Sequence, residues 1–358
     1  MQWGREFFCP IVCNYIHISV IYKPNIFLDM IKLKKEQRTA LKDIAFCDLF
    51  AGIGAFRIAL ESFGAKCVFS CEWDKDAQQT YQMNYKEIPA GDVTKIDEND
   101  IPSHDILCAG FPCQPFSISG KQLGFNDTRG TLFFDVARII NKQQPKIVLL
   151  ENVKNFASHD GGRTLNIVTD TLNNLGYDVF HDIYNASDYG VPQKRERIFF
   201  VCFKKEFGIK KFSTPAKITL KKHVEDILLP PDEVSDLIVR RNDVVLKDNV
   251  VEHYSCSPLR IGIVNKGGQG ERIYSIKGTA ITLSAYGGGI GAKTGLYMVD
   301  GNIRRLAPRE CARLDGFPDK FKIPENRNIA YKQFGNSIVV DVVQHIILQM
   351  INEGGVFA

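Results

Sequence analysis

The residue with the clearest chemical potential is Cys113, which lies in the segment Gly110-Phe111-Pro112-Cys113-Gln114-Pro115-Phe116-Ser117. This segment directly follows the apolar run 105–109, a predicted strand, and ligands of open α/β sheets bind beyond the carboxyl ends of strands. The flanking prolines restrict the backbone and would present the thiol rigidly. A lone cysteine is more often a buried structural thiol, but a polar loop framed by glycine and proline favours a nucleophile. We therefore predict that Cys113 is a nucleophile.

A carboxyl group is expected close to this thiol. Glu151 begins the segment Glu151-Asn152-Val153, immediately after the apolar run 146–150, which is another predicted strand. A glutamate in this place is often a helix cap, yet beside a nucleophilic cysteine it fits attack on a pyrimidine. Attack at C6 places negative charge on the ring, and a protonated or hydrogen-bonding carboxyl at N3 stabilises that charge.

Two arginines enter a later predicted strand in the run Gln193-Lys194-Arg195-Glu196-Arg197. Such a charge run is often a solvated strand edge. Alternating positions share one face of a strand, so Arg195 and Arg197 could instead serve one site together. Paired guanidinium groups suit a base carbonyl and a nearby phosphate or carboxylate.

A nucleoside pocket is indicated upstream, where the segment 48–54 (Asp-Leu-Phe-Ala-Gly-Ile-Gly) joins a predicted strand to a helix. A glycine turn alone is weak evidence for a nucleoside pocket. However, Glu72 ends the next strand about twenty residues after Gly52, and its carboxyl group suits hydrogen bonds to ribose hydroxyls. Trp73 could stack on adenine, and Asp92 could accept from its amino group. Because the Gly-x-Gly-x-x-Gly pattern of a pyrophosphate cradle is absent, S-adenosylmethionine fits better than NAD.

The elements that position these residues alternate from residue 44 onward. We predict strands at 44–50, 66–71, 105–109, 146–150, 177–184 and 197–203, and helices at 55–63, 77–84, 132–141 and 164–175. Strands alternating with helices indicate an α/β fold with a doubly wound, mostly parallel sheet.

The pattern changes after about residue 225. Residues 258–305 hold eleven glycines, and seven Lys and Arg residues against two acids. Short β-like runs at 272–276 and 280–284 indicate a smaller, glycine-rich domain of strands and loops; a surface insertion is the alternative. Helical patterns return from residue 308, and 339–351 is expected to pack on the first domain. The predicted division is 1–29, an extension; 30–225, a catalytic domain; 226–307, a recognition domain; and 308–358, a return to the catalytic domain.

Composition excludes several classes of protein. The chain has 358 residues, 44% of them hydrophobic and 24% charged, as in ordinary globular proteins. Its ten cysteines lack a Cys-x-x-Cys pair and histidines at metal-ligand spacing, which argues against a disulfide framework or a zinc site. Reduced thiols indicate a cytoplasmic protein. The apolar stretch 7–22 lacks a basic start and a cleavage site, so we interpret 1–29 as a leader upstream of a start at Met30.

Taken together, these segments resemble the bacterial DNA cytosine-5 methyltransferase family, from about residue 41 to the C-terminus. Besides 50–54, 110–114, 151–153 and 193–197, a fifth motif matches at Gln333-Phe334-Gly335-Asn336-Ser337. Each is modest alone, but five in family order are specific, and the intervening residues are most similar to the HhaI-type enzymes of restriction–modification systems. The resemblance implies catalytic roles for Cys113, Glu151, Arg195 and Arg197. It implies contacts with S-adenosylmethionine for Phe50, Gly52, Gly54, Glu72, Trp73, Asp92, Pro112 and Asn336, and no metal ion.

In that family the target cytosine is flipped out of the duplex. The resemblance implies a target-recognition domain that reads 5′-GCGC-3′ in double-stranded DNA, with the inner cytosine modified. Gln269 would fill the space left by the flipped base, and Arg272 would pair with a guanine edge. The full set of implied DNA contacts is Ser119, Gln269, Arg272, Thr282, Tyr286 and Gly289.

Three alternatives remain open at this point. They are a tRNA cytosine-5 methyltransferase, a non-catalytic DNA-binding relative and a nicotinamide oxidoreductase. The glycine-rich recognition segment favours duplex DNA, and a non-catalytic relative would be expected to lose Cys113 or Glu151. We also expect a monomer without a membrane partner, and an endonuclease that shares the target site without being bound.

Overall fold

The computed structural model describes residues 33–112, 132–248, 253–286 and 290–353. Its first sheet has six strands in the order β2-β1-β3-β4-β6-β5. The strands are β1 (Ala45–Leu49), β2 (Lys66–Cys71), β3 (Ile106–Gly110), β4 (Ile147–Val153), β5 (Tyr177–Asn185) and β6 (Glu196–Lys204). The pairs β1–β2, β1–β3 and β3–β4 are parallel, whereas β6 is antiparallel to both of its neighbours. The predicted, mostly parallel sheet is therefore confirmed, with β6 as the reversed strand.

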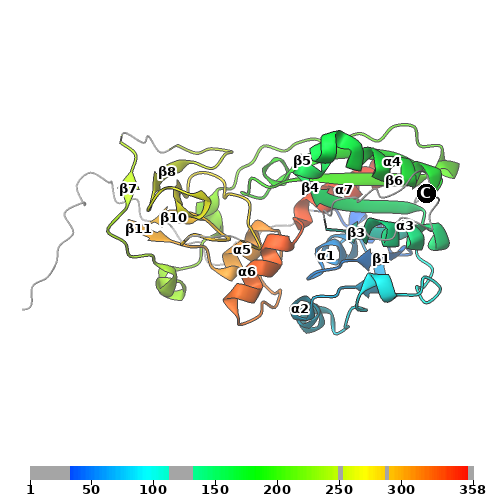
Figure 1. The fold of residues 1–358 in the computed structure, drawn as a ribbon, viewed down its shortest axis with the longest axis horizontal. Helices are drawn as coiled ribbons and strands as arrows, with labels where there is room; N and C mark the ends of the chain where they lie inside the picture. The colour runs from blue at the N-terminus through cyan, green and yellow to red at the C-terminus, as the bar shows by residue number, and fades with distance from the viewer. Residues whose placement is uncertain (1–32, 113–131, 249–252, 287–289, 354–358) are drawn as a thin grey trace, which may run out of the picture.

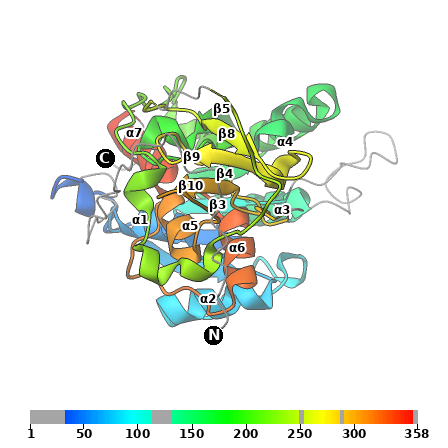
Figure 2. The same ribbon diagram turned by 90° about the vertical axis from the view of Figure 1, so that its left-hand side faces the viewer.

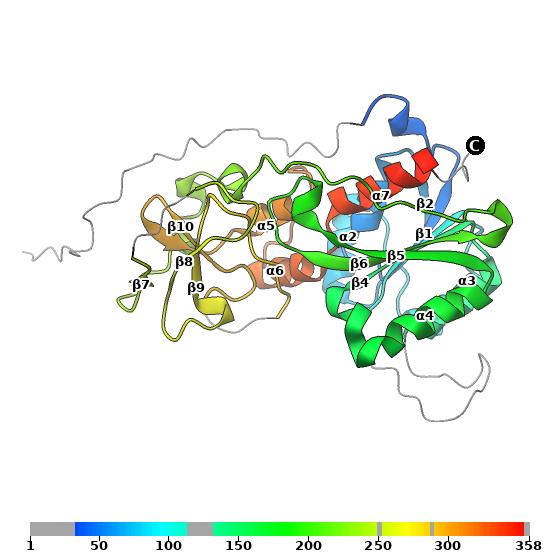
Figure 3. The ribbon, with the colours of Figure 1, turned by 90° about the horizontal axis from the view of Figure 1, so that it is seen from above.

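Helices cover both faces of this sheet. They are α1 (Ala55–Glu61), α2 (Lys75–Tyr85), α3 (Leu132–Gln143), α4 (Arg163–Asn174) and α7 (Val340–Glu353). Figure 3 shows α7 on one side of the sheet and α3 and α4 on the other. Both faces of β4 are buried: Leu149 packs in one hydrophobic cluster and its neighbour Leu150 in the other. This explains why the central strands are continuous apolar runs in the sequence.

A second sheet is formed by the glycine-rich segment, in the order β11-β10-β9-β8-β7. Its strands are β7 (Val245–Leu246), β8 (Arg260–Ile263), β9 (Arg272–Ser275), β10 (Leu296–Val299) and β11 (Asn302–Arg304). Figure 2, seen from the side of this sheet, shows β8 and β9 in front of the first sheet. The predicted run 272–276 is confirmed as β9, with its end one residue earlier.

The predicted strand at 280–284 is wrong. Of this segment only Ala280 forms a bridge, and its partner is Gln193 of the first domain. The Ala280 amide donates to Pro192 O at 2.7 Å, and the Lys194 amide donates to Ala280 O at 2.8 Å. The backbone of this segment therefore docks the second part of the chain onto the first domain instead of extending the second sheet. We call this second part, residues 226–307, the recognition region after the role that the sequence predicts for it.

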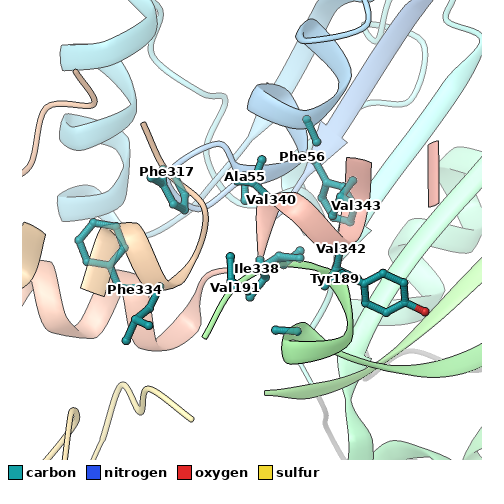
Figure 4. Packing of buried hydrophobic residues seen from close by; sticks show 14 of the residues in the cluster. Ala55, Phe56, Tyr189, Val191, Phe317, Phe334, Ile338, Val340, Val342 and Val343 are labelled. Atoms are coloured by element: carbon teal, nitrogen blue, oxygen red, sulfur yellow. The ribbon is translucent and has the colours of Figure 1, made fainter. Parts of the chain in front are cut away.

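Two helices, α5 (Pro308–Leu314) and α6 (Arg327–Asn336), lie between the sheets (Figure 1). One hydrophobic cluster runs through this junction, because residues of α1 and α7 share it with residues of β9 and β10. Figure 4 shows part of it, from Phe56 and Val343 past Ile338 to Phe334 and Phe317. The two parts of the protein thus share a core.

Among the described residues, the stretch 327–353 is long and apolar enough to cross a membrane by length and composition, with a hydropathy of 1.4. It contains α6 and α7, and 72% of its most apolar 18-residue segment is buried inside the protein. Burial of this kind is typical of core helices.

Candidate active site

A cleft of about 1950 Å³ opens where four parallel strands end, between the first sheet and the recognition region. Its walls come from the turns after β1 and β2, from the carboxyl ends of β3 and β4, and from α6. Most of the predicted site residues line it: Phe50, Gly52, Glu72, Trp73, Asp92, Pro112, Glu151, Arg197, Gln269, Thr282, Tyr286 and Asn336. Gly54, Arg195 and Arg272 are not among the lining residues. Cys113, Ser119 and Gly289 lie outside the described residues.

Glu72 is anchored by the backbone on both sides. Its Oε2 accepts from the Gly52 amide at 2.8 Å, and its Oε1 accepts from the Asp74 amide at 2.8 Å. Burial raises the pKa of this carboxyl, although the two amides oppose the shift. Since each oxygen keeps a second lone pair, the carboxyl is held in one orientation and can still accept hydrogen bonds from a ligand.

The side chains next to Glu72 suit an aromatic ring and its polar edge. Trp73 is 74% exposed, although it is a large hydrophobic side chain, and it lines the cleft. Asp92 Oδ1 accepts from the amide and hydroxyl of Thr94, at 3.1 and 2.8 Å. These bonds hold the pKa of Asp92 below its usual value. An exposed ring with a fixed carboxylate in the same cleft is an arrangement that fits a nucleobase.

In the turn before α1, close packing against Tyr85 requires glycine at position 54. Gly54 has a φ of 90°, and a Cβ there would lie 2.5 Å from the Tyr85 ring. Tyr85 in turn donates from its hydroxyl to Gly54 O at 3.0 Å. Gly54 therefore shapes the turn from beneath, and its direct contact with a cofactor stays a prediction.

Glu151 lies within β4 and not after the strand, because β4 extends to Val153. It is in register with Gly110 at the end of β3. A Cβ added to Gly110 would lie 3.5 Å from Glu151 Oε2. The next residues are fixed as well, since Asn152 Nδ2 donates to Phe111 O at 2.9 Å. The chain that leads to Cys113 therefore starts directly beside the Glu151 carboxyl.

Arg197 completes this part of the cleft. Its Nε lies 3.0 Å from Glu151 Oε1, and the two side chains are only 16% and 11% exposed. Burial raises the pKa of Glu151, and the nearby Arg197 and Arg195 oppose that shift. A buried carboxyl beside one arginine can hydrogen-bond a ring nitrogen while the guanidinium offers donors to an adjacent carbonyl.

Arg195 precedes β6 and lies beneath the cleft, where it is 2% exposed. Its guanidinium donates to Leu283 O and Gly335 O at 3.0 Å each, and also to Ser337 O. Burial lowers its pKa to about 10. Arg195 therefore ties the recognition region to the segment 335–337. The base contact that the resemblance implies for it stays a prediction.

Two further positioning residues, Gln193 and Gly335, lie within the motifs 193–197 and 333–337, and the sequence predicts no role for either. Gln193 is fully buried: its Nε2 donates to Leu314 O at 2.8 Å, and its Oε1 accepts from the Leu283 amide at 3.1 Å. At Gly335 a Cβ would lie 2.1 Å from the Ala285 nitrogen, so only glycine allows α6 to approach this backbone. Their place in otherwise recognisable motifs was the available signal.

The side chains for which DNA contacts are predicted stand on loops. Gln269 is exposed at the start of a short 3₁₀ turn that is capped by Glu271, whose Oε2 accepts from the Gly268 amide at 2.8 Å. Tyr286 is 75% exposed, and Thr282 donates from its hydroxyl to Lys194 O at 2.5 Å. Arg272 donates from Nε to Gly267 O at 3.3 Å, so its guanine contact stays a prediction.

One buried acid lies behind the cofactor side of the cleft. Asp48 on β1 is fully buried, and neither of its carboxyl oxygens has a hydrogen-bond partner among the described residues. Burial raises its pKa to about 8, so the neutral acid predominates at neutral pH.

Comparison with known proteins places the chain in a family. The family described as C-5 cytosine-specific DNA methylase matches residues 44–352. The type II methyltransferase M.HhaI of Haemophilus parahaemolyticus is 57% identical over 317 residues, which are 88% of this chain and 96% of that protein. The type II methyltransferase M.SsoII of Shigella sonnei is 44% identical, over 85% of this chain and 79% of that protein.

Solved structures share the fold. The putative DNA modification methyltransferase of an E. coli prophage superposes with a TM-score of 0.65 at 22% identity, over 87% of this chain and 99% of that one. For the Dnmt2 methyltransferase of S. pombe the TM-score is 0.64 at 18% identity, over 86% and 98% of the two chains. Together, the family match and the full-length relatives exclude a nicotinamide oxidoreductase. The chain belongs to the C-5 cytosine-specific DNA methylase family and is a DNA (cytosine-5) methyltransferase.

Proposed function

We propose that the chain transfers a methyl group from S-adenosylmethionine to C5 of the inner cytosine of 5′-GCGC-3′ in double-stranded DNA. The observation that carries this proposal is the position of the Glu151–Arg197 pair. It lies beside Gly110, from which the chain leads to Cys113, in the same cleft as Glu72 and Trp73. A thiol, a carboxyl for N3 and a nucleoside pocket are the three parts that methylation at C5 requires.

The cofactor side of the cleft fits an adenosine group. Glu72 is held by two amides and would accept from ribose hydroxyls, the exposed Trp73 ring offers a stacking face, and Asp92 offers an acceptor for an amino group. When bound, S-adenosylmethionine supplies an electrophilic methyl group and leaves as S-adenosylhomocysteine. The proposed reaction uses no metal ion. His223, Glu225 and Asp226 gather potential ligand atoms within 4.8 Å of one another, but they do not line the cleft.

The chemistry begins with a base outside the stack, because C5 and C6 cannot be reached inside a duplex. The Cys113 thiolate forms a bond to C6, and the negative charge that develops on the ring is stabilised by Glu151 at N3. Arg197 holds the Glu151 carboxyl and offers donors to the base carbonyl. C5 then takes the methyl group, a solvent base removes the C5 proton, the thiolate leaves from C6, and N3 returns its proton to Glu151. Donation by Glu151 requires its protonated form, which the raised pKa favours.

The proposed setting is the cytoplasm, where a monomeric enzyme protects DNA from an endonuclease that reads the same site. The identity to type II methyltransferases supports this setting. Bisulfite sequencing of DNA from cells that express the chain tests activity and target together. We expect the inner cytosine of GCGC to resist bisulfite conversion. Resistance at another sequence instead would overturn the proposed target. Complete conversion of the DNA, or methylation found in tRNA alone, would overturn the proposed substrate.

The covalent step has its own test. With 5-fluorocytosine at the target position, the enzyme and cofactor should form a covalent complex, because fluorine cannot leave C5 as a proton does. The Cys113→Ser variant should form no complex and should transfer no methyl groups, while it keeps cofactor binding and its unfolding temperature. Methylation by this variant at near the parent rate would rule out attack by Cys113.

A further inference from the structure

A second, shallower depression of about 500 Å³ adjoins the cleft where the recognition loop meets the start of α6. Its polar lining residues are Tyr286, Lys293, Asn326, Asn328 and Lys332. Tyr286 and Lys332 also line the cleft, so the depression opens directly from it. No residue assigned so far to cofactor binding or catalysis is part of this depression.

The depression carries an excess of one positive charge. Lys332 Nζ lies 2.6 Å from Asp74 Oδ2, so one of the two lysines is already paired. Lys293 has no ion pair within the part of the chain that the structure describes, and none of the lining residues is acidic. A phosphodiester carries a single negative charge, which this arrangement would neutralise.

Lys293 also occupies a backbone position that is unfavourable for a lysine. Its φ is 76°, in the left-handed region that glycine adopts without strain. Glycine occupies the positions two residues before and after it, Gly291 and Gly295. Its carbonyl accepts from the Ser284 amide at 2.9 Å, which holds the turn against the recognition loop. Because non-glycine residues kept in strained conformations cluster at binding sites, position 293 is a candidate for a binding role.

The N-terminus of α6 is not what attracts an anion here. Asn326 Oδ1 already accepts from the amides of Asn328 and Ile329, at 3.0 and 3.4 Å. These amides are therefore capped within the protein. The attraction comes from the ammonium group of Lys293, with Lys332 Nζ and the Tyr286 hydroxyl as additional donors.

We propose that this depression binds one backbone phosphate of the DNA duplex that lies in the cleft, with Lys293 as the principal contact. The proposal rests on the proposed action on duplex DNA. Phosphate contacts fix the position of a protein on the duplex and carry no sequence information. Lys293 therefore strengthens binding to target and non-target duplexes alike.

The test is the salt dependence of duplex binding by the full chain, measured on one duplex with GCGC and one without it. Lys293→Gly should lower the slope of log Kd against log salt by about 0.9, the value for one phosphate contact. Between 50 and 200 mM salt, the difference in affinity between parent and variant should then shrink about 3.5-fold. Lys293→Arg keeps the charge and should keep the slope. Because glycine suits the backbone at this position, the unfolding temperature of Lys293→Gly should not fall.

The matched control is Lys247→Ala. Lys247 is exposed and directly follows β7, the edge strand of the second sheet (Figure 1), and it lines neither cavity. The slope of log Kd against log salt for Lys247→Ala should equal that of the parent. An unchanged slope for Lys293→Gly would overturn the proposal, as would equal losses for Lys293→Gly and Lys247→Ala. The slope on the duplex without GCGC requires no methylation, so this result is independent of whether GCGC is the target.

Discussion

The two sides of the cleft are built differently. On the proposed cofactor and catalytic side, carboxyl groups are buried and held by backbone amides or by an arginine, as for Glu72 and Glu151. On the proposed DNA side, Gln269 and Tyr286 are exposed and stand on loops. The first side holds groups in place for a reaction that tolerates little displacement. The second has side chains that remain free to form contacts when the duplex arrives. Substitutions on the two sides should therefore act on different steps.

The largest effect is expected for Glu151→Gln. We expect the single-turnover rate of methyl transfer to fall by about 10²- to 10³-fold, because the amide cannot donate a proton to N3 as the acid can. Duplex affinity should change little. The pH profile sharpens this prediction: burial raises the pKa of Glu151, so the parent rate should fall as the pH rises through that pKa. This alkaline limb should be missing in Glu151→Gln. A rise through the same range that is present in the parent and missing in Glu151→Gln would show that the carboxylate acts as a base instead, whereas a rise shared by both would come from ionisation of the Cys113 thiol.

Trp73→Ala should have an intermediate effect, limited to the cofactor. Loss of a stacking face costs about 1 to 3 kcal/mol, so the KM for S-adenosylmethionine should rise about 5- to 150-fold, with kcat within about twofold. Trp73→Phe keeps an aromatic face and is the matched control. The chain has only two tryptophans, so quenching of Trp73 fluorescence gives a direct binding measurement. A fall in kcat without a change in KM would contradict the assigned stacking role.

Gln269→Ala should have the smallest effect. If Gln269 fills the space left by the flipped base, the variant should methylate a matched duplex about three- to fivefold more slowly, because less of the cost of unpairing is offset. On a duplex in which the target cytosine is mispaired, the rates of variant and parent should agree. Equal rates on matched duplexes would remove the space-filling role and weaken the contrast between the two sides.

The sequence predicted the strands and site residues of the first sheet better than those of the second sheet. The predicted strand 66–71 coincides with β2, in which the β-branched and aromatic residues Val68 and Phe69 are central, although only Ser70 and Cys71 are buried. Glu72 and Trp73 could be placed because they directly follow such a strand, whose end faces the site in this fold.

The second sheet was harder to predict, because its strands are short and separated by glycine turns. β9 was found, but 280–284 was assigned to a strand, since its apolar residues have a β-like pattern. Its backbone partners are Pro192 and Lys194, far away in the sequence. The burial of Arg195 has the same origin: its acceptors Leu283, Gly335 and Ser337 come together only in the folded protein. Contacts that depend on distant segments leave no local pattern.

The pairing of 192–194 with Ala280 also decides which part of the protein could be exchanged with a relative of different target sequence. A transplanted recognition segment would have to bring a backbone that pairs with Lys194 and passes within contact distance of Gly335. Gln193 and Arg195 bind this backbone through the amide and carbonyl of Leu283, which every amino acid except proline provides. These hydrogen bonds do not depend on the side chain at position 283, but the incoming segment would also have to fill the shared core, to which Ala280 and Leu283 contribute. A graft that keeps both the backbone bonds and these core contacts is the one expected to leave the first domain unchanged.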